Sequence, residues 1–362
     1  MTTPGNKTII AVHLLNDFSG SPLVFSQALR ALQKDGHEVI IHTSRWKEGF
    51  LNKVPARFVG FPYRFYPNAI LRLFAFVFSQ VYLFFQLMRY RKTDAVIYIN
   101  TILPFGAALA GAFMRKKVVY HLHESYIRPA ALKKFLRFIA AKTADTVLYV
   151  SEYLENEERI HGVNGKVVYN AVSDDFIRQA AMHQYQLQPQ SKFTVLMVCS
   201  LKDYKGIPEF LRLASRHPQL QFEMVINATE TDIRHYFSRH ELPFNFTWHP
   251  VQRNLDPFYR RANLVVNLTN PDQCVETFGM TILEAMCYGI PVIAPTVGGP
   301  TEIVQEQQNG FSIDVRDEAT LDFRLQFLAE HPEFMERLSE GARKTTERFT
   351  SKKFSEEIIR SF

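Results

Sequence analysis

Short apolar runs rich in Val, Ile and Leu alternate with longer amphipathic stretches along the whole chain. In the first half these runs occupy residues 7–15, 37–44, 94–100, 116–122 and 145–151. The second half repeats the rhythm at residues 193–200, 220–226, 263–269 and 290–295. Continuous apolar strands that alternate with amphipathic helices are typical of buried parallel sheets. The pattern therefore predicts an α/β fold made of two Rossmann-like, doubly wound domains that face a central cleft.

A glutamine-rich segment separates the two series of strands. It covers residues 179–192, and we expect the linker there, beginning near Ala171. A chain of 362 residues is long for a single core, so its length also favours two domains. We place the first domain at residues 1–172 and the second at residues 173–345.

The longest apolar stretch, residues 69–88, approaches the length of a membrane span. It contains Arg72, Gln80 and Gln86, which are costly to place in lipid. A long helix packed on a sheet is the favoured interpretation, ahead of a membrane-facing surface and of a true span. The N-terminal residues lack the apolar core and the cleavage site of a signal peptide, so we expect a cytoplasmic protein.

Composition and charge narrow the class of partner. A hydrophobic fraction of 46% and a charged fraction of 22% are those of a folded soluble protein. Residues 1–170 carry 22 Lys and Arg against 11 Asp and Glu, with basic clusters at residues 89–92, 115–117 and 133–137. This excess predicts an anionic partner, either an anionic membrane surface or a phosphorylated acceptor. No nucleic-acid partner is expected, because the clusters match no nucleic-acid-binding motif.

The chain has three cysteines, Cys199, Cys274 and Cys287, all in the second half. An odd and sparse set inside apolar runs predicts buried free thiols in a reducing compartment. Their spacing fits no zinc site.

The first amphipathic stretch opens with Ser-Gly-Ser-Pro at residues 19–22. Ser21 is suited to cap a helix, Pro22 to its first position, and Gly20 lets a ligand approach the backbone. A helix N-terminus that follows a strand binds anions readily. The segment matches neither the dinucleotide fingerprint nor the P-loop, which argues against a dinucleotide-dependent oxidoreductase and an NTPase.

A second candidate anion site lies in residues 275–289, with the sequence VETFGMTILEAMCYG. Thr277 can cap a helix that begins at Phe278. The amides of Gly279 and Met280 would then be free to bind a phosphate.

Two glutamates, Glu276 and Glu284, accompany this helix start. Glu284 shares a helix face with Met280 and Thr281 and leans towards the N-terminus, beside any anion bound there. Its neighbours are apolar, and a buried carboxylate must be paired. Two partners stay open: the diol of a ribose, or a salt bridge to a neighbouring strand. Glu276 either contacts the ligand or only eases the helix dipole.

Two histidines, His121 and His123, alternate along a predicted strand and therefore point to the same side. Such a pair can bind a metal, but no third ligand with suitable spacing accompanies it. A structural role at the end of the strand is the other interpretation.

The segment ETFGMTILEAMCYGIPVIAPTVGGPTEIV, residues 276–304, closely resembles the donor-site signature of the GT-B retaining glycosyltransferases of family 4, a pair of glutamates with seven residues between them. Supporting pieces follow in the family's order at residues 19–22, 121–125, 149–154, 167–176 and 200–211. The resemblance covers most of the chain and implies the GT-B fold. It also implies that the last helix, near residues 346–362, returns to the first domain.

By this resemblance, Glu276 contacts sugar hydroxyls of a nucleotide-sugar donor, and Glu284 holds its ribose. Backbone amides at the helix start bind the sugar or the diphosphate. The further donor-binding candidates are Gly20, Ser21, Phe278, Gly279, Met280 and Thr281.

One departure from the family concerns the diphosphate. The family's second domain usually opens with an Arg and, five residues later, a Lys, which together neutralise the donor. Lys205 matches the Lys, whereas Ser200 stands at the Arg position. Lys202 is the candidate substitute, although an ammonium does not reproduce a guanidinium fork. A leaving diphosphate still needs a cation in a dry site.

The family places a histidine near the transferred sugar, often followed by an acidic or amide residue. His123, followed by Glu124, is the first candidate, and His121 is the second. Asn170 is a further secondary candidate. The expected catalytic residues are His123, Glu276 and Lys205. The implied mechanism retains configuration, with the departing phosphate helping to deprotonate the acceptor and with no metal or cofactor.

The resemblance implies a hexosyltransferase that uses a UDP- or GDP-sugar at the inner face of the membrane. Its acceptor would be a lipid-linked or cell-surface glycan, such as a polysaccharide or lipopolysaccharide. Two alternatives stay open. A catalytically silent GT-B subunit is favoured by Ser200, and a GT-B UDP-sugar epimerase needs additional acid or base groups near the sugar.

Overall fold

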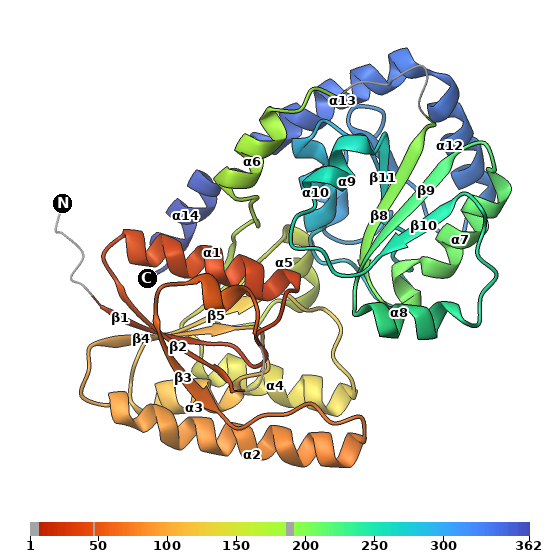
Figure 1. Ribbon diagram of the computed structural model, residues 1–362. Helices are drawn as coiled ribbons and strands as arrows, with labels where there is room; N and C mark the ends of the chain where they lie inside the picture. Colours follow the sequence, from red (N-terminus) through yellow and green to blue (C-terminus); the bar gives the residue numbers. More distant parts are fainter. Residues whose placement is uncertain (1–6, 46–47, 186–191) are drawn as a thin grey trace. The chain divides into compact units, whose positions relative to one another are not determined.

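The chain folds into two compact units, each built around one parallel sheet (Figure 1). The computed structural model describes residues 7–45, 48–185 and 192–362. The first unit comprises Met1–Asn170 with Lys352–Phe362, and the second comprises Ala171–Ser351. Helices alternate with strands in both units, which confirms the predicted α/β architecture. The segment predicted as linker includes residues 186–191, which lie outside the described part of the chain.

The first unit holds a seven-stranded sheet in the order β3-β2-β1-β4-β5-β6-β7. The strands are β1 (Thr8–Val12), β2 (Glu38–Ser44), β3 (Arg57–Phe61), β4 (Ala95–Asn100), β5 (Val118–Leu122), β6 (Thr146–Tyr149) and β7 (Asn164–Val167). Every residue of the central strands β1 and β4 is buried, as their unbroken apolar character predicts. Strand order reverses between β1 and β4. The carboxyl ends of these two strands therefore form the switch point at which open α/β sheets bind ligands.

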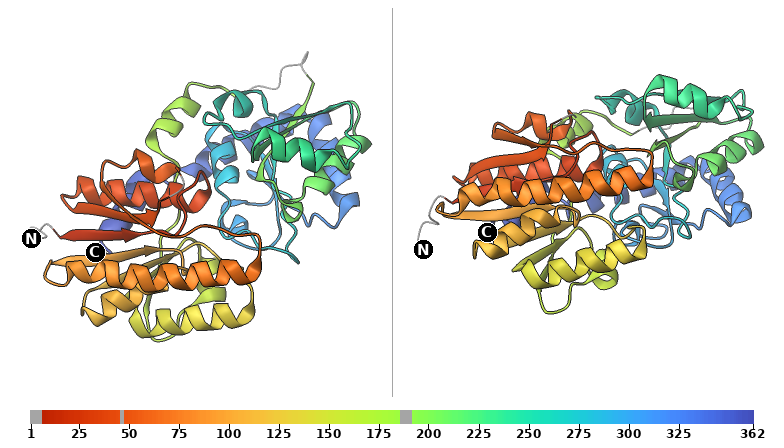
Figure 2. Two further views of the ribbon diagram at one scale, coloured as in Figure 1. Left: turned by 60° about the horizontal axis from the view of Figure 1, so that its bottom comes forward. Right: turned by 90° about the horizontal axis from the view of Figure 1, so that it is seen from below.

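Helices cover both faces of this sheet (Figures 1 and 2). The helical segments are α1 (Gly20–Lys34), η1 (Phe50–Lys53), α2 (Ala69–Leu87), η2 (Met88–Tyr90), α3 (Phe105–Phe113), α4 (Ala130–Thr143) and α5 (Glu152–Glu158). Right-handed crossovers place α1 on one face and α2, α3 and α4 on the other, because the chain crosses the sheet in opposite directions before and after β3.

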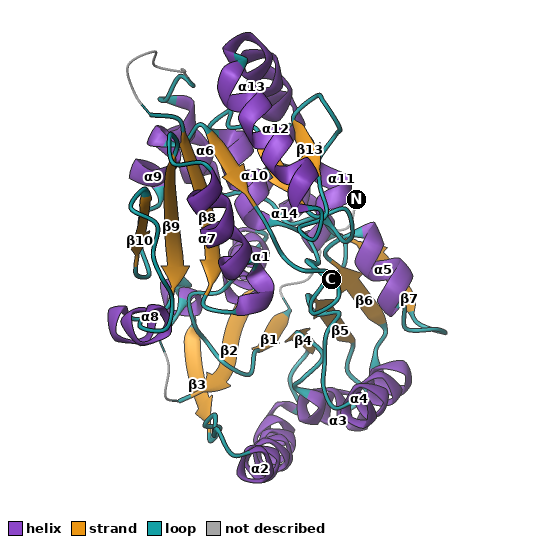
Figure 3. Ribbon diagram, turned by 90° about the vertical axis from the view of Figure 1, so that its right-hand side faces the viewer, coloured by secondary structure: helices purple, strands orange, loops and turns teal. Residues whose placement is uncertain are grey.

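The second unit holds a six-stranded sheet in the order β10-β9-β8-β11-β12-β13. Figure 3 labels β8, β9, β10 and β13 of this sheet. The strands are β8 (Thr194–Ser200), β9 (Gln221–Asn227), β10 (Phe246–His249), β11 (Leu264–Val266), β12 (Val292–Ala294) and β13 (Gly310–Ser312). The helical segments are α6 (Asp174–Ala181), η3 (Asp203–Lys205), α7 (Ile207–Arg216), α8 (Glu230–Phe237), α9 (Asp256–Arg261), α10 (Met280–Cys287), α11 (Pro300–Ile303), α12 (Glu318–Glu330) and α13 (Pro332–Thr346). Here the order reverses between β8 and β11, so their carboxyl ends form the second switch point.

The last helix, α14 (Ser351–Ile359), leads the chain into the first unit. The ring of Phe362 packs against Tyr98 of β4, with 4.7 Å between the centroids. The Lys117 ammonium donates to the Ser361 carbonyl at 2.8 Å. The C-terminal residues therefore pack on the first sheet.

Helix α2 is buried on one side and exposed on the other. Its two glutamines face inwards: Gln80 accepts a hydrogen bond from the Gly106 amide at 3.1 Å, and Gln86 donates to the Gly60 carbonyl at 3.1 Å. With η2 it is the one helix of the described residues that is long and apolar enough to cross a membrane, by length and composition only. Of its most apolar window, 33% is buried. The helix thus packs on the sheet, as favoured from the sequence, but leaves a broad side uncovered.

Candidate active site

The loop that follows β11 carries Glu276 and leads into helix α10. Helix α10 begins at Met280, and its N-cap is Gly279 with φ 107°, in the left-handed region that favours glycine. The first bonds to the cap carbonyl come from the amides of Ile282 and Leu283, at 3.1 and 3.2 Å. The amides of Met280 and Thr281 precede those bonds, at the position where helices bind anions.

The helix start predicted from the sequence is wrong by two residues. Thr277 does not cap the helix, and Phe278 lies outside it. The left-handed backbone at Gly279 delays the first helical turn. Phe278 instead packs its ring against Phe349, 5.8 Å between the centroids. The first amides of the helix are therefore those of Met280 and Thr281, whereas the sequence predicted those of Gly279 and Met280.

Glu276 is paired in the protein itself. The Lys205 ammonium lies 2.7 Å from Oε2 of Glu276, and the side-chain amide of Asn267 donates to the same oxygen at 3.5 Å. Burial disfavours the charge on Glu276, but the ammonium and these hydrogen bonds outweigh it and hold its pKa below the usual value. Burial likewise opposes the charge on Lys205, and Glu276 reverses the effect and raises the Lys205 pKa. Both groups are therefore ionised at neutral pH. Asn267, at the end of β11, was not predicted.

Glycines make this arrangement possible. Gly206 has φ 86°, and a Cβ there would lie 2.3 Å from the Leu268 carbonyl oxygen, so the Lys205 turn can lie directly against the β11 loop. Gly298 has φ 101°, and a Cβ would lie 2.2 Å from the Glu276 carbonyl oxygen. The Gly299 amide donates to that same carbonyl at 2.9 Å. The Gly-Gly pair of the signature thus serves to seat the backbone that carries Glu276.

Glu284 has a neutral partner. The hydroxyl of Tyr259, a fully buried residue of α9, donates to Oε2 of Glu284 at 2.8 Å. Burial raises the pKa of Glu284 to about 7, although the tyrosine bond opposes that rise. The sequence left open a salt bridge between Glu284 and a neighbouring strand. This alternative is wrong, because Tyr259 supplies a hydrogen bond and no positive charge. A half-buried carboxylate of this kind is well placed to accept hydrogen bonds from a diol.

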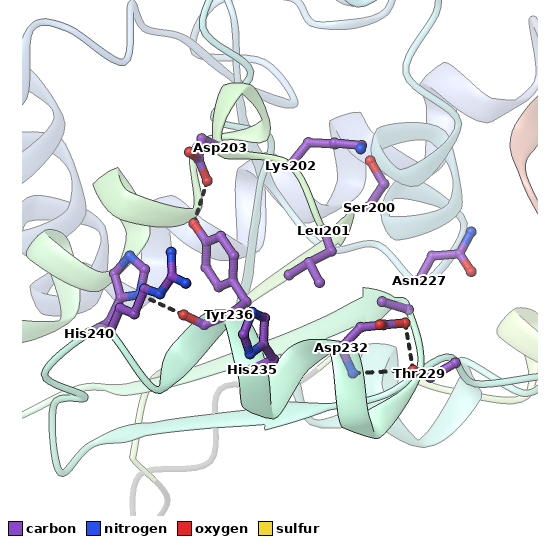
Figure 4. A pocket seen from close by; sticks show the side chains of 12 residues that line it. Ser200, Leu201, Lys202, Asp203, Asn227, Thr229, Asp232, His235, Tyr236 and His240 are labelled. Atoms are coloured by element: carbon purple, nitrogen blue, oxygen red, sulfur yellow. Dashed lines mark hydrogen bonds between the residues drawn. The ribbon is translucent and has the colours of Figure 1, made fainter. Parts of the chain in front are cut away.

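A cavity of about 720 Å³ opens beside the carboxyl end of β8 (Figure 4). Ser200, which stands at the position of the expected Arg, lines it together with Lys202. The Tyr236 hydroxyl donates to Asp203 at 2.6 Å and joins α8 to the loop after β8. Arg239, just beyond α8, also lines the cavity and brings a guanidinium that sequence reasoning missed. The cavity thus contains cations from two separate segments.

In the first unit, the predicted cap of α1 is displaced. The N-cap is Ser19 and the helix begins at Gly20. The amide of Ser19 donates to the Asp17 carboxylate at 3.0 Å, which sets the turn before the helix. Ser21 lies in the first turn, where its carbonyl accepts from Asn100 at 3.3 Å. A Cβ on Gly20 would meet no atom within 4 Å, so open space lies in front of this backbone.

A histidine cluster lies at the neighbouring strand ends. His123 follows β5, and its Nε2 lies 2.8 Å from Oδ1 of Asn100. The amide nitrogen of Asn100 lies 3.0 Å from Nδ1 of His13. Because Asn100 accepts through Oδ1, His123 carries a proton on Nε2. Burial, with smaller contributions from His121 and His13, lowers the pKa of His123 well below its usual value. His123 is therefore a neutral imidazole held by Asn100, a residue that was not predicted.

His121 and Glu124 flank this histidine differently. The rings of His121 and His123 lie 4.5 Å apart, which confirms that they point to the same side. His121 is fully buried, its Nδ1 lies 2.8 Å from the Tyr98 hydroxyl, and burial lowers its pKa to about 3. Glu124 is half-buried, and burial raises its pKa to about 7. His121 thus supports the ring of His123 from inside the sheet.

The remaining predicted residues are Asn170 and the three cysteines. Asn170 is buried at the end of the first unit, and its Oδ1 has no partner among the described residues. All three cysteines are free thiols, but only Cys287 is buried, whereas Cys199 and Cys274 are half-buried. Among residues 7–45, 48–185 and 192–362, no group of three or more His, Cys, Asp or Glu is placed to hold a metal ion.

Comparison with known families accounts for both units. Residues 19–176 match the family described as Glycosyltransferase Family 4, and residues 179–345 match Glycosyl transferases group 1. The chain belongs to glycosyltransferase family 4. This membership confirms the resemblance seen in residues 276–304.

Solved structures share the fold of this family 4 member. Anabaena Alr3699/HepE in complex with UDP and glucose is 19% identical, with a TM-score of 0.77 over 98% of each chain. The apo lipopolysaccharide outer core galactosyltransferase WaaB is 18% identical, with a TM-score of 0.71 over 98% of this chain and 100% of that one. These neighbours confirm the GT-B fold.

Curated relatives are longer than this chain. The sucrose synthase of Nitrosomonas europaea is 40% identical over 232 residues, which make up 57% of this chain. The matched stretch spans 29% of that sucrose synthase. The similarity therefore concerns a part of the larger protein.

Proposed function

We propose that this family 4 member transfers a hexose from a nucleoside diphosphate sugar to a glycan acceptor, with retention of configuration. One observation carries the proposal: a Lys205–Glu276 pair lies before the first amides of α10, and Glu284 lies on the same helix. Glu284 is one turn beyond Met280, about 6 Å along the axis. Since helical side chains lean towards the N-terminus, its carboxylate lies near any anion bound at the helix start.

Each part of the donor would contact a different one of these groups. The diphosphate takes the amides of Met280 and Thr281 and the charge of Lys205, which stabilises the leaving group as the glycosidic bond breaks. Glu276, already fixed by Lys205, accepts from the sugar hydroxyls. Glu284 accepts from the ribose diol. We propose that protein cations, rather than a metal or a cofactor, supply the positive charge.

The nucleoside base and the sugar of the donor are proposed from what similar proteins bind. HepE forms complexes with UDP and glucose and with UDP-glucose, which makes a UDP-hexose the first donor to test. WaaB is a lipopolysaccharide galactosyltransferase, which supports a lipid-linked or cell-surface glycan as acceptor. His123 suits the transferred sugar, because a neutral imidazole fixed by Asn100 can form a directed hydrogen bond without a charge.

A catalytically silent donor-binding subunit is the second candidate. The observation that favours it is Ser200 in place of the diphosphate-binding Arg. Lys202 and Arg239 line the same cavity as Ser200, and the first proposal requires one of them to compensate for the missing charge.

Turnover separates the two candidates. The purified chain is incubated with UDP- and GDP-hexoses, with and without glycan acceptors, and released nucleoside diphosphate is measured. The anomeric configuration of any glycoside is determined by NMR. We expect turnover that falls about 100-fold in Lys205→Gln, because the leaving group loses a preorganised cation, and that stays unchanged in the matched surface variant Lys34→Gln. Donor binding without turnover would support the silent subunit, and inversion would refute the proposed mechanism.

A further inference from the structure

The helices on one face of the first sheet present a large apolar surface to solvent. On α2 the exposed side is apolar along its whole length, and the exposures of Phe74, Phe78 and Phe85 are 71%, 60% and 68%. The aromatic face is defined here by its exposed residues: Ile70, Leu71, Leu73, Phe74, Val77, Phe78, Val81, Phe85, Phe113, Phe135 and Phe138. A surface helix normally shows the reverse distribution, with polar residues outside.

Three polar residues of α2 lie on its buried side, whereas Arg72, near its start, is only half-buried. Ser79, Gln80 and Gln86 are buried and hydrogen-bonded within the first unit. Two of these bonds join α2 to α3 and to the sheet. A transmembrane orientation would break them, so α2 is suited to lie along a surface rather than to cross a bilayer.

The aromatic face continues from α2 onto α3 and α4. The ring of Phe84 lies 6.0 Å from that of Phe113 on α3, and the ring of Phe105 lies 5.2 Å from that of Phe135 on α4. Figure 2 shows α2, in orange, and α4, in yellow, on this same side of the first unit. The exposed aromatic residues therefore form one surface on three helices, larger than the isolated apolar residues of ordinary surfaces.

The charged residues of the three helices are all basic. The sequences of α2, α3 and α4 contain no Asp or Glu. Residues 61–150 carry 13 Lys and Arg but only three Asp and Glu. Lys134 and Lys142 of α4 are exposed beside the aromatic face, as are Arg89, Arg91 and Lys92 after α2. Apolar side chains flanked by basic groups are the pattern of a protein that binds an anionic membrane surface.

A second copy of the chain is a poorer occupant. A two-fold interface brings the same patch of both copies together. Two such faces would place basic groups opposite basic groups with no acidic residue on the three helices to pair with them. An anionic lipid surface, by contrast, complements both the aromatic residues and the charge.

We propose that the aromatic face of α2, α3 and α4 docks on the surface of a bilayer that contains anionic lipid, such as a cytoplasmic leaflet. The aromatic side chains enter the interfacial layer, and the basic groups contact the headgroups. The proposal is independent of the donor site, because its residues lie in the first unit and the donor-binding glutamates lie in the second.

Co-sedimentation of the full chain with vesicles tests this proposal. Vesicles of phosphatidylcholine alone are compared with vesicles that also contain phosphatidylglycerol, at increasing salt. We expect binding to the phosphatidylglycerol vesicles that weakens as salt screens the charges. Phe74→Ser with Phe78→Ser should lower the partition coefficient tenfold or more, because two large apolar groups leave the interface.

Matched variants test which surface binds the vesicles and whether ionic contacts contribute to that binding. Phe244→Ser removes an aromatic residue of the second unit that is 83% exposed, and should not change binding. Lys134→Gln and Lys142→Gln should each reduce binding to anionic vesicles about fivefold and leave binding to neutral vesicles unchanged. Nucleotide binding and thermal unfolding of each variant report that the fold is intact.

Three results would overturn the proposal. The first is no vesicle binding by the wild-type chain, and the second is an equal loss of binding in Phe244→Ser. The third is a dimer in lipid-free solution that Phe74→Ser with Phe78→Ser dissociates. That third result would assign the aromatic face to contact between copies.

Discussion

The two glutamates of the donor loop should respond to neutralisation in opposite ways. Glu284 faces the neutral hydroxyl of Tyr259, whereas Glu276 faces the Lys205 ammonium. Replacing Glu284 by Gln removes a charge that burial disfavours and keeps an oxygen for the tyrosine bond. Replacing Glu276 by Gln leaves Lys205 without its counter-ion. We therefore expect Glu284→Gln to stabilise the empty protein and Glu276→Gln to destabilise it.

The expected size follows from the pKa of Glu284. Its rise from 4.5 to about 7 corresponds to about 3 kcal/mol, at about 1.4 kcal/mol for each unit. Partial exposure of the carboxylate reduces this to about 2 kcal/mol. A change of that size raises the unfolding temperature of a domain of this length by about 4–8 °C. The loss of the half-buried Lys205 pair should cost about 1–2 kcal/mol in Glu276→Gln.

The pH dependence distinguishes the two variants further. The folded protein holds a proton on Glu284 up to about pH 7, so stability is lost as pH rises from 4.5 to 7. The gain in Glu284→Gln should therefore be full at pH 8, fall to a small part of that at pH 5, and vanish below pH 4.5. The pKa of Glu276 is lowered, so its stabilisation is present above pH 4.5 and lost only at lower pH. The cost of Glu276→Gln should persist at pH 5.

Thermal unfolding followed by circular dichroism at pH 5 and pH 8 measures both effects. The wild type and Tyr259→Phe are run in parallel, since Tyr259→Phe should raise the Glu284 pKa further and reduce stability at pH 8. A Glu284→Gln variant that melts at or below the wild-type temperature at pH 8 would refute the reasoning. It would mean that the charge of Glu284 is compensated in the folded protein.

Two further predictions concern backbone fit and histidine position. Gly298→Ala should weaken donor binding at least tenfold in calorimetric titration, because its Cβ would lie 2.2 Å from the Glu276 carbonyl oxygen. Gly162→Ala is the control, with φ 80° and no atom within 4 Å, and an equal loss there would show that backbone strain alone is responsible. Asn100→Leu should lower kcat about tenfold and leave donor affinity unchanged, because His123 loses the acceptor at 2.8 Å that orients it. A change in donor affinity alone would contradict this role.

Buried strands were predictable from the sequence and edge strands were not. All nine strands inferred from apolar runs are present, among them the fully buried β1 and β4. The strands without a prediction, β3, β7, β10 and β13, are the four edges of the two sheets. Edge strands need only one buried side, and β7 has no buried residue. Their sequences therefore lack a continuous apolar run.

The residues of the candidate site that belong to short sequence motifs were predictable. The glutamate pair, Lys205 and His123 follow motifs of a few residues. Tyr259 and Asn100 could not be predicted, because they reach the site from other elements through tertiary packing. The predicted starts of α1 and α10 were both wrong by two residues, because helix propensities do not include the backbone turn that precedes a helix. The left-handed backbone of Gly279 makes α10 begin later, and the turn at residues 17–19 makes α1 begin earlier.

The central claim is that Glu284 holds the ribose of a nucleotide-sugar donor. Isothermal titration of a UDP-hexose tests it most directly, with Glu284→Ala and the exposed control Glu333→Ala beside the wild type. A sugar-linked diphosphate avoids the ionisation of a free terminal phosphate. The account predicts equal affinity for the wild type and Glu333→Ala, and a loss of about 100-fold or more in Glu284→Ala, since two hydrogen bonds to a carboxylate disappear. Wild-type affinity in Glu284→Ala would contradict it.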